Sequence, residues 1–255
     1  MHGKQTYDQL ATSVGRSKRW VQQQLFETEM DREPVVPGDV VIVMDTTYFR
    51  RTFGVMVWRC PHRKKNLLWR FTPYETLEGY IRGVQELEEQ GWNVIGVVCD
   101  GRRGLFQAFP VPVQMCHFHQ AQIVTRYVTK NPKLQAGQEL QALMRELPHT
   151  DEASFGRWFE QWYIKWHDFI TEKTIDPATN AWHYTHKRLR SAFFSIRRNL
   201  PFLFAFERYA DRNIPNSTNS LEGTFGHIKD KIRLHRGLKL HRKQKLIEEL
   251  LQGEN

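Results

Sequence analysis

Two short apolar runs, each followed directly by an aspartate, constrain the fold of this chain more than any other feature. Residues 40–44 precede Asp45, and residues 94–99 precede Asp100. Runs of this length that are rich in valine and isoleucine are typical of strands covered on both faces of a sheet. Open α/β sheets place their ligands at the carboxyl ends of such strands. If the two strands are neighbours, the sequence predicts two adjoining carboxylates at one edge of the sheet.

The segments around these runs predict the rest of an α/β sheet. Residues 53–59 and 67–72 have strand patterns separated by a loop at 61–66, and residues 75–90 have the pattern of an amphipathic helix that Gly91 ends. The chain thus has three strands, a helix and a fourth strand, with an acid after the first and fourth strands. Because this is the ribonuclease-H-like order, we expect a ribonuclease-H-like mixed sheet.

The first 33 residues predict a separate DNA-binding segment. Two short helices, at residues 6–13 and 17–26, are expected to meet at a tight turn, with Ser17 as the N-cap of the second. Ala11, Gly15 and Val21 have the spacing of a helix-turn-helix. An ordinary helical hairpin is the alternative. The residues expected to face inward are Leu10, Ala11, Val14, Val21 and Leu25, and those expected to face a DNA groove are Lys18, Arg19, Gln22 and Gln23.

The charge balance favours a polyanionic partner. The chain has 255 residues with 37 Lys and Arg against 28 Asp and Glu, a formal net charge of +9. Nucleic acid is the first candidate for such a partner, and an acidic membrane surface is the second. No apolar stretch approaches the roughly 20 residues of a membrane span, and the three cysteines form no disulfide framework. We therefore expect a soluble, intracellular protein.

Residues 118–210 are predicted to be helical throughout. An aromatic stripe runs through residues 158–166, and its spacing favours a buried helix face over a surface that stacks on unpaired bases. Basic clusters at residues 183–198 and 229–245 flank Glu222 in the sequence. Such runs are usually solvated faces, but beside a site that acts on phosphate they favour phosphate contact. The basic residues expected to bind DNA here are Lys187, Arg188, Arg190, Lys229, Arg233 and Arg236.

Glu222 is the third acid of interest and lies near the start of a helical pattern at residues 221–232. Mg²⁺ is usually held by one or two carboxylates together with substrate phosphates. Taken singly, Asp45 and Asp100 are also explained as turn residues and Glu222 as a charge at a helix N-terminus. Taken together, after two apolar runs and on a basic chain, they favour a metal site that acts on phosphodiester bonds.

Cys116 and His119 form a second pattern of interest. A structural zinc site normally needs four ligands, and Cys60 with His62 would supply a second pair at an unusually short spacing. We favour the alternative that Cys116 and His119 pack beneath the metal site and orient its ligands.

Four segments carry a resemblance to a known family: residues 45–48 (Asp-Thr-Thr-Tyr), 99–105, 112–120 and 214–223. In this order they resemble the Mutator-type transposases of bacterial insertion sequences, enzymes of the DDE class. The resemblance covers roughly residues 40–250. It implies a ribonuclease-H-like core interrupted by a helical insertion, which fits the 122 residues between Asp100 and Glu222 (222 − 100).

The resemblance implies a catalytic triad of Asp45, Asp100 and Glu222, with Cys116 and His119 as the Cys-x-x-His signature. It also implies two Mg²⁺ ions (or Mn²⁺), double-stranded DNA as substrate and target, a homodimer on DNA and a bacterial cytoplasmic location at the nucleoid. A DNA-binding regulator that does not cut, and a nuclease that cuts without joining, are the alternatives. The expected organisation is a DNA-binding segment at 1–33, catalytic core at 38–120, helical insertion at 121–212 and the rest of the core at 213–255.

Overall fold

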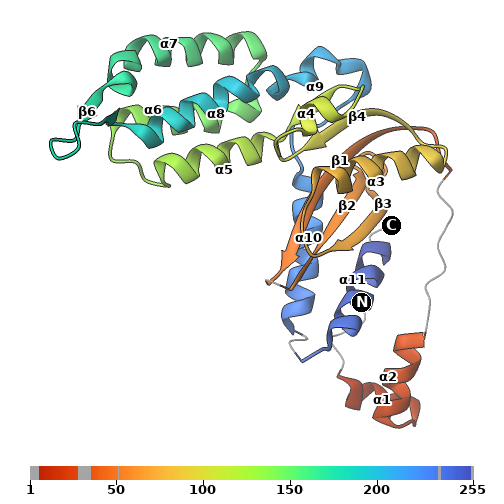
Figure 1. Cartoon of the computed structure of the whole chain (residues 1–255). Coiled ribbons are helices and arrows are strands. Elements are labelled where there is room, and N and C mark those ends of the chain that lie inside the picture. Colours follow the sequence, from red (N-terminus) through yellow and green to blue (C-terminus); the bar gives the residue numbers. More distant parts are fainter. Residues whose placement is uncertain (1–5, 28–35, 51, 235–236, 254–255) are drawn as a thin grey trace. The chain divides into compact units, whose positions relative to one another are not determined.

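The computed structural model describes residues 6–27, 36–50, 52–234 and 237–253 (Figure 1). The chain divides into two compact units: Pro37–Gly223, and Met1–Val36 together with Thr224–Asn255. The sequence placed residues 213–255 in one segment, whereas the division falls inside the helix α10 (Asn219–Leu234). Each unit is described separately below.

The larger unit contains a five-stranded mixed sheet, which confirms the α/β class expected from the sequence. Its strand order is β3-β2-β1-β4-β5. The first three strands pair antiparallel, while β4 pairs parallel with both β1 and β5. The strands are β1 (Asp39–Phe49), β2 (Phe53–Cys60), β3 (Lys65–Thr72), β4 (Asn93–Cys99) and β5 (Val113–Met115).

The strand β1 is longer than its apolar run predicts, and Asp45 lies within it rather than at its end. The parallel pairing of β1 with β4 stops at Val43 and Val98. The antiparallel pairing of β1 with β2, in contrast, continues to Phe49. This second pairing keeps the chain extended beyond Asp45. Asp45 and Asp100 therefore each lie two residues past the last parallel pair, on neighbouring strands.

The helix α3 (Leu77–Glu89) covers one face of this sheet (Figure 1). It begins two residues later than its sequence pattern predicts, because the Thr76 side chain caps it by accepting a hydrogen bond from the Gly79 N–H. Its buried residues include Tyr80, whose ring lies edge-on to the buried Trp58 of β2. The cap leaves Glu75 in the turn before the helix, outside its regular hydrogen bonding.

The remainder of the larger unit is a helical layer that shares its hydrophobic core with Met115 of β5. Phe159 and Trp162 are buried in this core against Phe193, so the core interpretation of the aromatic stripe is correct for them, whereas Trp158 is exposed. A hairpin of β6 (Lys173–Ile175) and β7 (Trp182–Tyr184) interrupts the layer, so the prediction of helix throughout was wrong there. The main helices are α4 (Leu105–Ala108), α5 (His117–Val128), α6 (Gln135–Glu146), α7 (Glu152–Thr171), α8 (Lys187–Leu203) and α9 (Ala205–Arg208).

The smaller unit contains the expected pair of short N-terminal helices, α1 (Tyr7–Val14) and α2 (Lys18–Glu27), and also α11 (Leu240–Gly253). Gly15 makes the turn with a positive φ of 64°, and the Ser17 hydroxyl accepts a hydrogen bond from the Trp20 N–H. Ala11 and Val21 are buried as expected. Val14 and Leu25 remain exposed, which corrects the expectation that they close the core of this segment; two helices this short bury only their nearest residues.

Within the described residues, no helix is both long and apolar enough to cross a membrane.

Candidate metal centre

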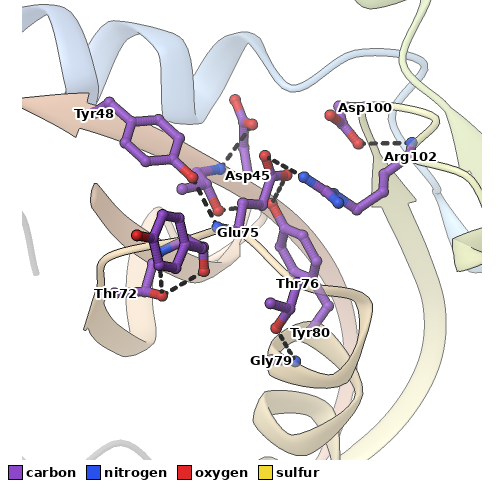
Figure 2. A network of polar contacts seen from close by, with 11 residues as sticks. Asp45, Tyr48, Thr72, Glu75, Thr76, Gly79, Tyr80, Asp100 and Arg102 are labelled. Atoms are coloured by element: carbon purple, nitrogen blue, oxygen red, sulfur yellow. Dashed lines mark hydrogen bonds and ion pairs between the residues drawn. The ribbon is translucent and has the colours of Figure 1, made fainter. Parts of the chain in front are cut away.

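Asp45 and Asp100 lie on one side of the sheet, where β1 and β4 diverge (Figure 2). Asp45 is nearly buried, with 9% of its surface exposed, and its carboxylate accepts a hydrogen bond from the Thr46 N–H (2.8 Å). Asp100 is half-buried and accepts from the Arg102 N–H (2.9 Å). Each carboxylate is therefore fixed by the backbone that follows it.

A short chain of hydrogen bonds through Cys116 and Thr218 orients the Glu222 carboxylate. The Thr218 N–H donates to the Cys116 sulfur, the Cys116 thiol donates to the Thr218 hydroxyl, and that hydroxyl donates to the Glu222 carboxylate (3.3, 3.3 and 3.4 Å). Cys116 follows β5 and is fully buried. Cys116, directly after β5, thus helps to fix the position of the Glu222 carboxylate in the first turn of α10. This arrangement is compatible with the orienting role expected for Cys116.

The acids lie close enough to affect one another's protonation. The pKa of Asp45 is raised to about 7, chiefly by burial and in smaller part by the charges of Asp100, Glu75 and Glu222, while the hydrogen bond from the Thr46 N–H lowers it. Burial also raises the pKa of Asp100, with Glu75 adding to the effect while the Arg102 N–H and His119 oppose it. Burial likewise raises the pKa of Glu222. The charges of Asp100, Glu75 and Glu222 therefore all reach the buried carboxylate of Asp45, although 122 residues separate Asp100 from Glu222.

Glu75 is the member of this cluster that the sequence did not reveal (Figure 2). Its carboxylate accepts a hydrogen bond from the Tyr80 hydroxyl (2.8 Å) and pairs with the Arg102 guanidinium (2.9 Å). The Thr46 hydroxyl lies 2.8 Å from the Tyr80 hydroxyl, so the network reaches the backbone beside Asp45. The helical pattern had placed Glu75 inside a helix. A threonine cap directly after it was the signal that it precedes the helix instead.

This donor set fits a hard divalent cation. Carboxylate oxygens are the ligands that Mg²⁺ prefers, and a cation would offset the burial and the neighbouring negative charges that raise the pKa of Asp45. Among the described residues, the three acids do not form a cluster with all ligand atoms within 4.8 Å of one another.

Cys116, His119 and Glu222 do form such a cluster, with ligand atoms within 4.8 Å of one another. The buried Nδ1 of His119 has no hydrogen-bond partner among the residues the structure describes. Cys60 and His62 do not join this cluster, because Cys60 ends β2 and its sulfur accepts from the Arg63 N–H instead. The alternative of a four-ligand zinc site is therefore wrong in including Cys60 and His62.

The basic residues expected to bind DNA are placed on three helices. On α8, Lys187 and Arg188 are exposed, but Arg190 packs its guanidinium over the Tyr184 ring (3.9 Å), which makes it part of the fold. On α2, Lys18 pairs with Asp8 (2.8 Å). The remaining members are Arg19, Gln22, Lys229 and Arg233, which lie on α2 and α10, and Arg236, which lies outside the described residues.

No protein-family model matches the sequence, and no curated protein is significantly similar to it. What the chain does must therefore be argued from the geometry of the acids and the chemistry that they support.

Removing the Asp45 charge is expected to stabilise the metal-free protein at neutral and alkaline pH. The unfolded chain loses the Asp45 proton near pH 3.8, whereas the folded chain keeps it until about pH 7. Between these values the folded state binds more protons, so the free energy of unfolding falls as pH rises. Above pH 7, the free energy of unfolding of Asp45→Asn should therefore exceed that of the wild type by roughly 2–4 kcal/mol. The variant should accordingly unfold at a higher temperature.

Thermal unfolding in a chelator, scanned from pH 4 to pH 8, measures this effect. The stability difference between Asp45→Asn and the wild type should shrink toward pH 4. Saturating Mg²⁺ should also reduce this difference, because it stabilises only the wild type. The exposed Asp168→Asn serves as the control and should show no gain. An Asp45→Asn protein no more stable than the wild type at pH 8 would show that Asp45 is not a strained carboxylate.

Proposed function

We propose that this protein is a DNA transposase of the DDE class with a ribonuclease-H-like core. The observation that carries the proposal is that Asp100 and Glu222, acids from distant parts of the sequence, both act electrostatically on the buried carboxylate of Asp45. The strand order β3-β2-β1-β4-β5, with β4 parallel to β1, is compatible with that core. In this proposal the helices between β5 and α10 are the expected insertion.

In this proposal, Asp45, Asp100 and Glu222 would hold two Mg²⁺ ions, or Mn²⁺ as a substitute. When bound, the ions supply activation of the attacking oxygen and stabilisation of the leaving oxygen. The protein's own contribution is orientation: Thr46 and Arg102 fix the two aspartates, and the Cys116–Thr218 pair fixes Glu222. Such prior positioning lowers the barrier by avoiding reorganisation during the reaction.

The proposed reaction has two displacements at phosphorus. Water first attacks the phosphodiester at the end of the element, which releases a 3′-hydroxyl and leaves a 5′-phosphate on the flanking strand. The 3′-oxygen then attacks a phosphodiester of the target, forms the new bond, and releases a 3′-hydroxyl of the target strand. The proton from each attacking oxygen leaves to solvent. The double-stranded DNA partner fits the net charge of +9, and joining two DNA ends suits a homodimer.

The proposal is tested with DNA that carries the sequences flanking the gene, a supercoiled target plasmid, and Mg²⁺ or Mn²⁺. We expect strand cleavage at the element ends and covalent joining of those ends to the plasmid. Cleavage without joined product would identify a nuclease, and binding without either would identify a DNA-binding regulator. Either result would refute the transposase assignment. Ca²⁺ in place of Mg²⁺ provides the control for binding without chemistry.

Glu75 is expected to act as a positioning residue for this reaction. Glu75→Gln keeps the shape of the side chain but replaces its ion pair with the Arg102 guanidinium by a weaker neutral contact. The Arg102 N–H donates to the Asp100 carboxylate, so this carboxylate would be held less firmly. Residues that orient metal ligands typically contribute about 10–100-fold in metal affinity or activity. We therefore expect cleavage at limiting Mg²⁺ to fall by about 10-fold or more, with partial recovery at high Mg²⁺. A merely structural residue would show no dependence on Mg²⁺ concentration.

The matched control for this prediction is Glu78→Gln, one turn further along. Glu78 pairs with Arg82 on the exposed side of α3 and has no contact with the acids. It should leave both cleavage and the Mg²⁺ requirement unchanged. Equal losses in the two variants would remove Glu75 from the site.

A further inference from the structure

A cavity of about 590 Å³ lies beside the metal centre, inside the larger unit. Its lining comes from the loop that follows Asp100, from α4, from α5 and from α8, and α5 and α8 run side by side (Figure 1). The loop enters the lining at Gly101, the residue directly after Asp100. A residue that lines the cavity therefore directly follows an acid of the candidate metal centre in the sequence. The volume of the cavity is within the range of pockets that bind small organic ligands.

The rim of this cavity is positively charged. Arg103, Arg126 and Arg198 line it and are all exposed, and no acidic residue is among its lining residues. In the described part of the chain, none of these three guanidiniums forms an ion pair with a carboxylate. A rim of three available arginines is suited to phosphate oxygens, which a guanidinium binds with two parallel hydrogen bonds.

The charge of the rim acts on the catalytic cluster itself. Burial lowers the pKa of His119, Asp100 raises it, and the positive charge of Arg126 lowers it. Arg126 and Asp100 therefore act on the same imidazole from the cavity and from the metal centre. Positive charge at this rim would offset part of the repulsion between the carboxylates and a DNA phosphate.

The floor and walls of the cavity suit a nucleobase. Ser195 and Asn199 form a buried floor that is held by Gln120, with hydrogen bonds of 3.3 and 2.7 Å. The Ser195 hydroxyl also donates to the Ala192 carbonyl (2.7 Å), so its proton is already committed. The floor is therefore prearranged, and the Asn199 amide is the part of it that can meet the edge of a ligand. Tyr127 lines the cavity with 37% of its surface exposed, which leaves an aromatic ring available for stacking. Base stacking on such a ring contributes about 1–3 kcal/mol.

We propose that this cavity binds one unpaired nucleotide of the DNA strand beside the phosphodiester that is cut. The arginines of the rim bind the phosphates, the Tyr127 ring stacks on the base, and the floor forms hydrogen bonds with the edge of the base. This inference rests on the proposed function for its substrate. A base must leave the double helix to enter the cavity, and the contacts within it offset the few kcal/mol lost on unstacking.

The inference is tested by binding alone, without metal and without cleavage. Two duplexes of the same sequence are compared, one fully paired and one with a single unpaired 2-aminopurine nucleotide. We expect the wild type to bind the second duplex more tightly and to quench its 2-aminopurine fluorescence. Replacing Arg103, Arg126 and Arg198 with glutamine should reduce the preference for the unpaired duplex about tenfold or more.

Matched controls separate a cavity from a general basic surface. Replacing the exposed Lys133, Arg157 and Lys173 with glutamine removes the same charge elsewhere and should lower binding of both duplexes equally. Tyr127→Leu should abolish the quenching, whereas Tyr74→Leu, at a residue that is 76% exposed, should not. The tyrosine pair alone carries the test if the triple arginine variant fails to fold.

The inference is overturned if the wild type binds both duplexes equally, or if the control triple variant loses the preference as well. Free deoxyadenosine monophosphate offers the same chemistry without a strand, so displacement of the 2-aminopurine duplex by equal concentrations of it would also overturn the inference. Since no DNA is cut in this experiment, a protein that passes it but cleaves nothing would refute only the proposed function.

Discussion

Asp45→Asn, Asp100→Asn and Glu222→Gln are each expected to lower strand cleavage and strand joining by about a thousandfold or more. Each substitution keeps the size of the side chain but removes a negative charge that burial already disfavours, and that neighbouring acids disfavour as well at Asp45 and Asp100. An amide is a poor ligand for Mg²⁺ in comparison with a carboxylate. Both reaction steps use the same centre, so both rates should fall together.

The measurement is the rate of cleavage of DNA that carries the element ends, and of joining for DNA ends supplied already cut. Binding of uncut DNA in Ca²⁺ should remain within a fewfold of wild type, because the triad supplies metal ligands rather than contacts to the duplex. Asp168→Asn, at an exposed position in α7, is the control for a lost charge elsewhere. Undiminished cleavage in all three triad variants would exclude these acids as the catalytic centre.

Gly101→Ala is expected to damage both the stability of the protein and the geometry of its metal centre. Gly101 has a φ of +85°, which side chains rarely adopt, and an added Cβ would lie 2.2 Å from the sulfur of Met115. Met115 is fully buried in the core, so it has little room to move. Strain and overpacking together should lower the free energy of unfolding by about 2–4 kcal/mol. The adjacent Asp100 would shift with the loop, and cleavage should fall by at least about tenfold.

Gly156→Ala provides the matched control for this prediction. Gly156 is on the helix α7, and an added Cβ would meet nothing within 4 Å. This variant should be as stable as the wild type or more stable by about 0.5–1 kcal/mol. Thermal unfolding distinguishes the two, with a fall of roughly 5–15 °C expected only for Gly101→Ala. Similar melting temperatures would mean that the Asp100 loop tolerates a side chain, and that its glycine does not hold the site in shape.

The sequence predicted those parts of the structure that depend on local patterns. The apolar runs before Asp45 and Asp100 became the paired strands β1 and β4, Gly15 makes the predicted turn after α1, and Ser17 caps α2 as expected. These features depend on burial of both faces of a strand and on caps within a few residues. Both are visible in a single segment of sequence.

Features that depend on distant partners were not predictable in the same way. β1 extends past Asp45 only because β2 pairs with it, and no run of residues in β1 alone signals that length. Glu75 belongs to the site because Arg102, 27 residues later, turns back to it. Glu222 required resemblance to identify it, because the Cys116–Thr218 contact that orients it joins residues 102 positions apart.

The location of bound metal tests the central claim most directly. Crystals of the protein soaked in Mn²⁺ and measured at the manganese absorption edge would show where the ion binds, independently of any DNA. We expect anomalous peaks within ligand distance of Asp45 and Asp100, with Glu222 facing the same region, and their loss in Asp45→Asn. Manganese bound elsewhere, or a wild-type acidic cluster that stays free of it at saturating concentration, would contradict the account.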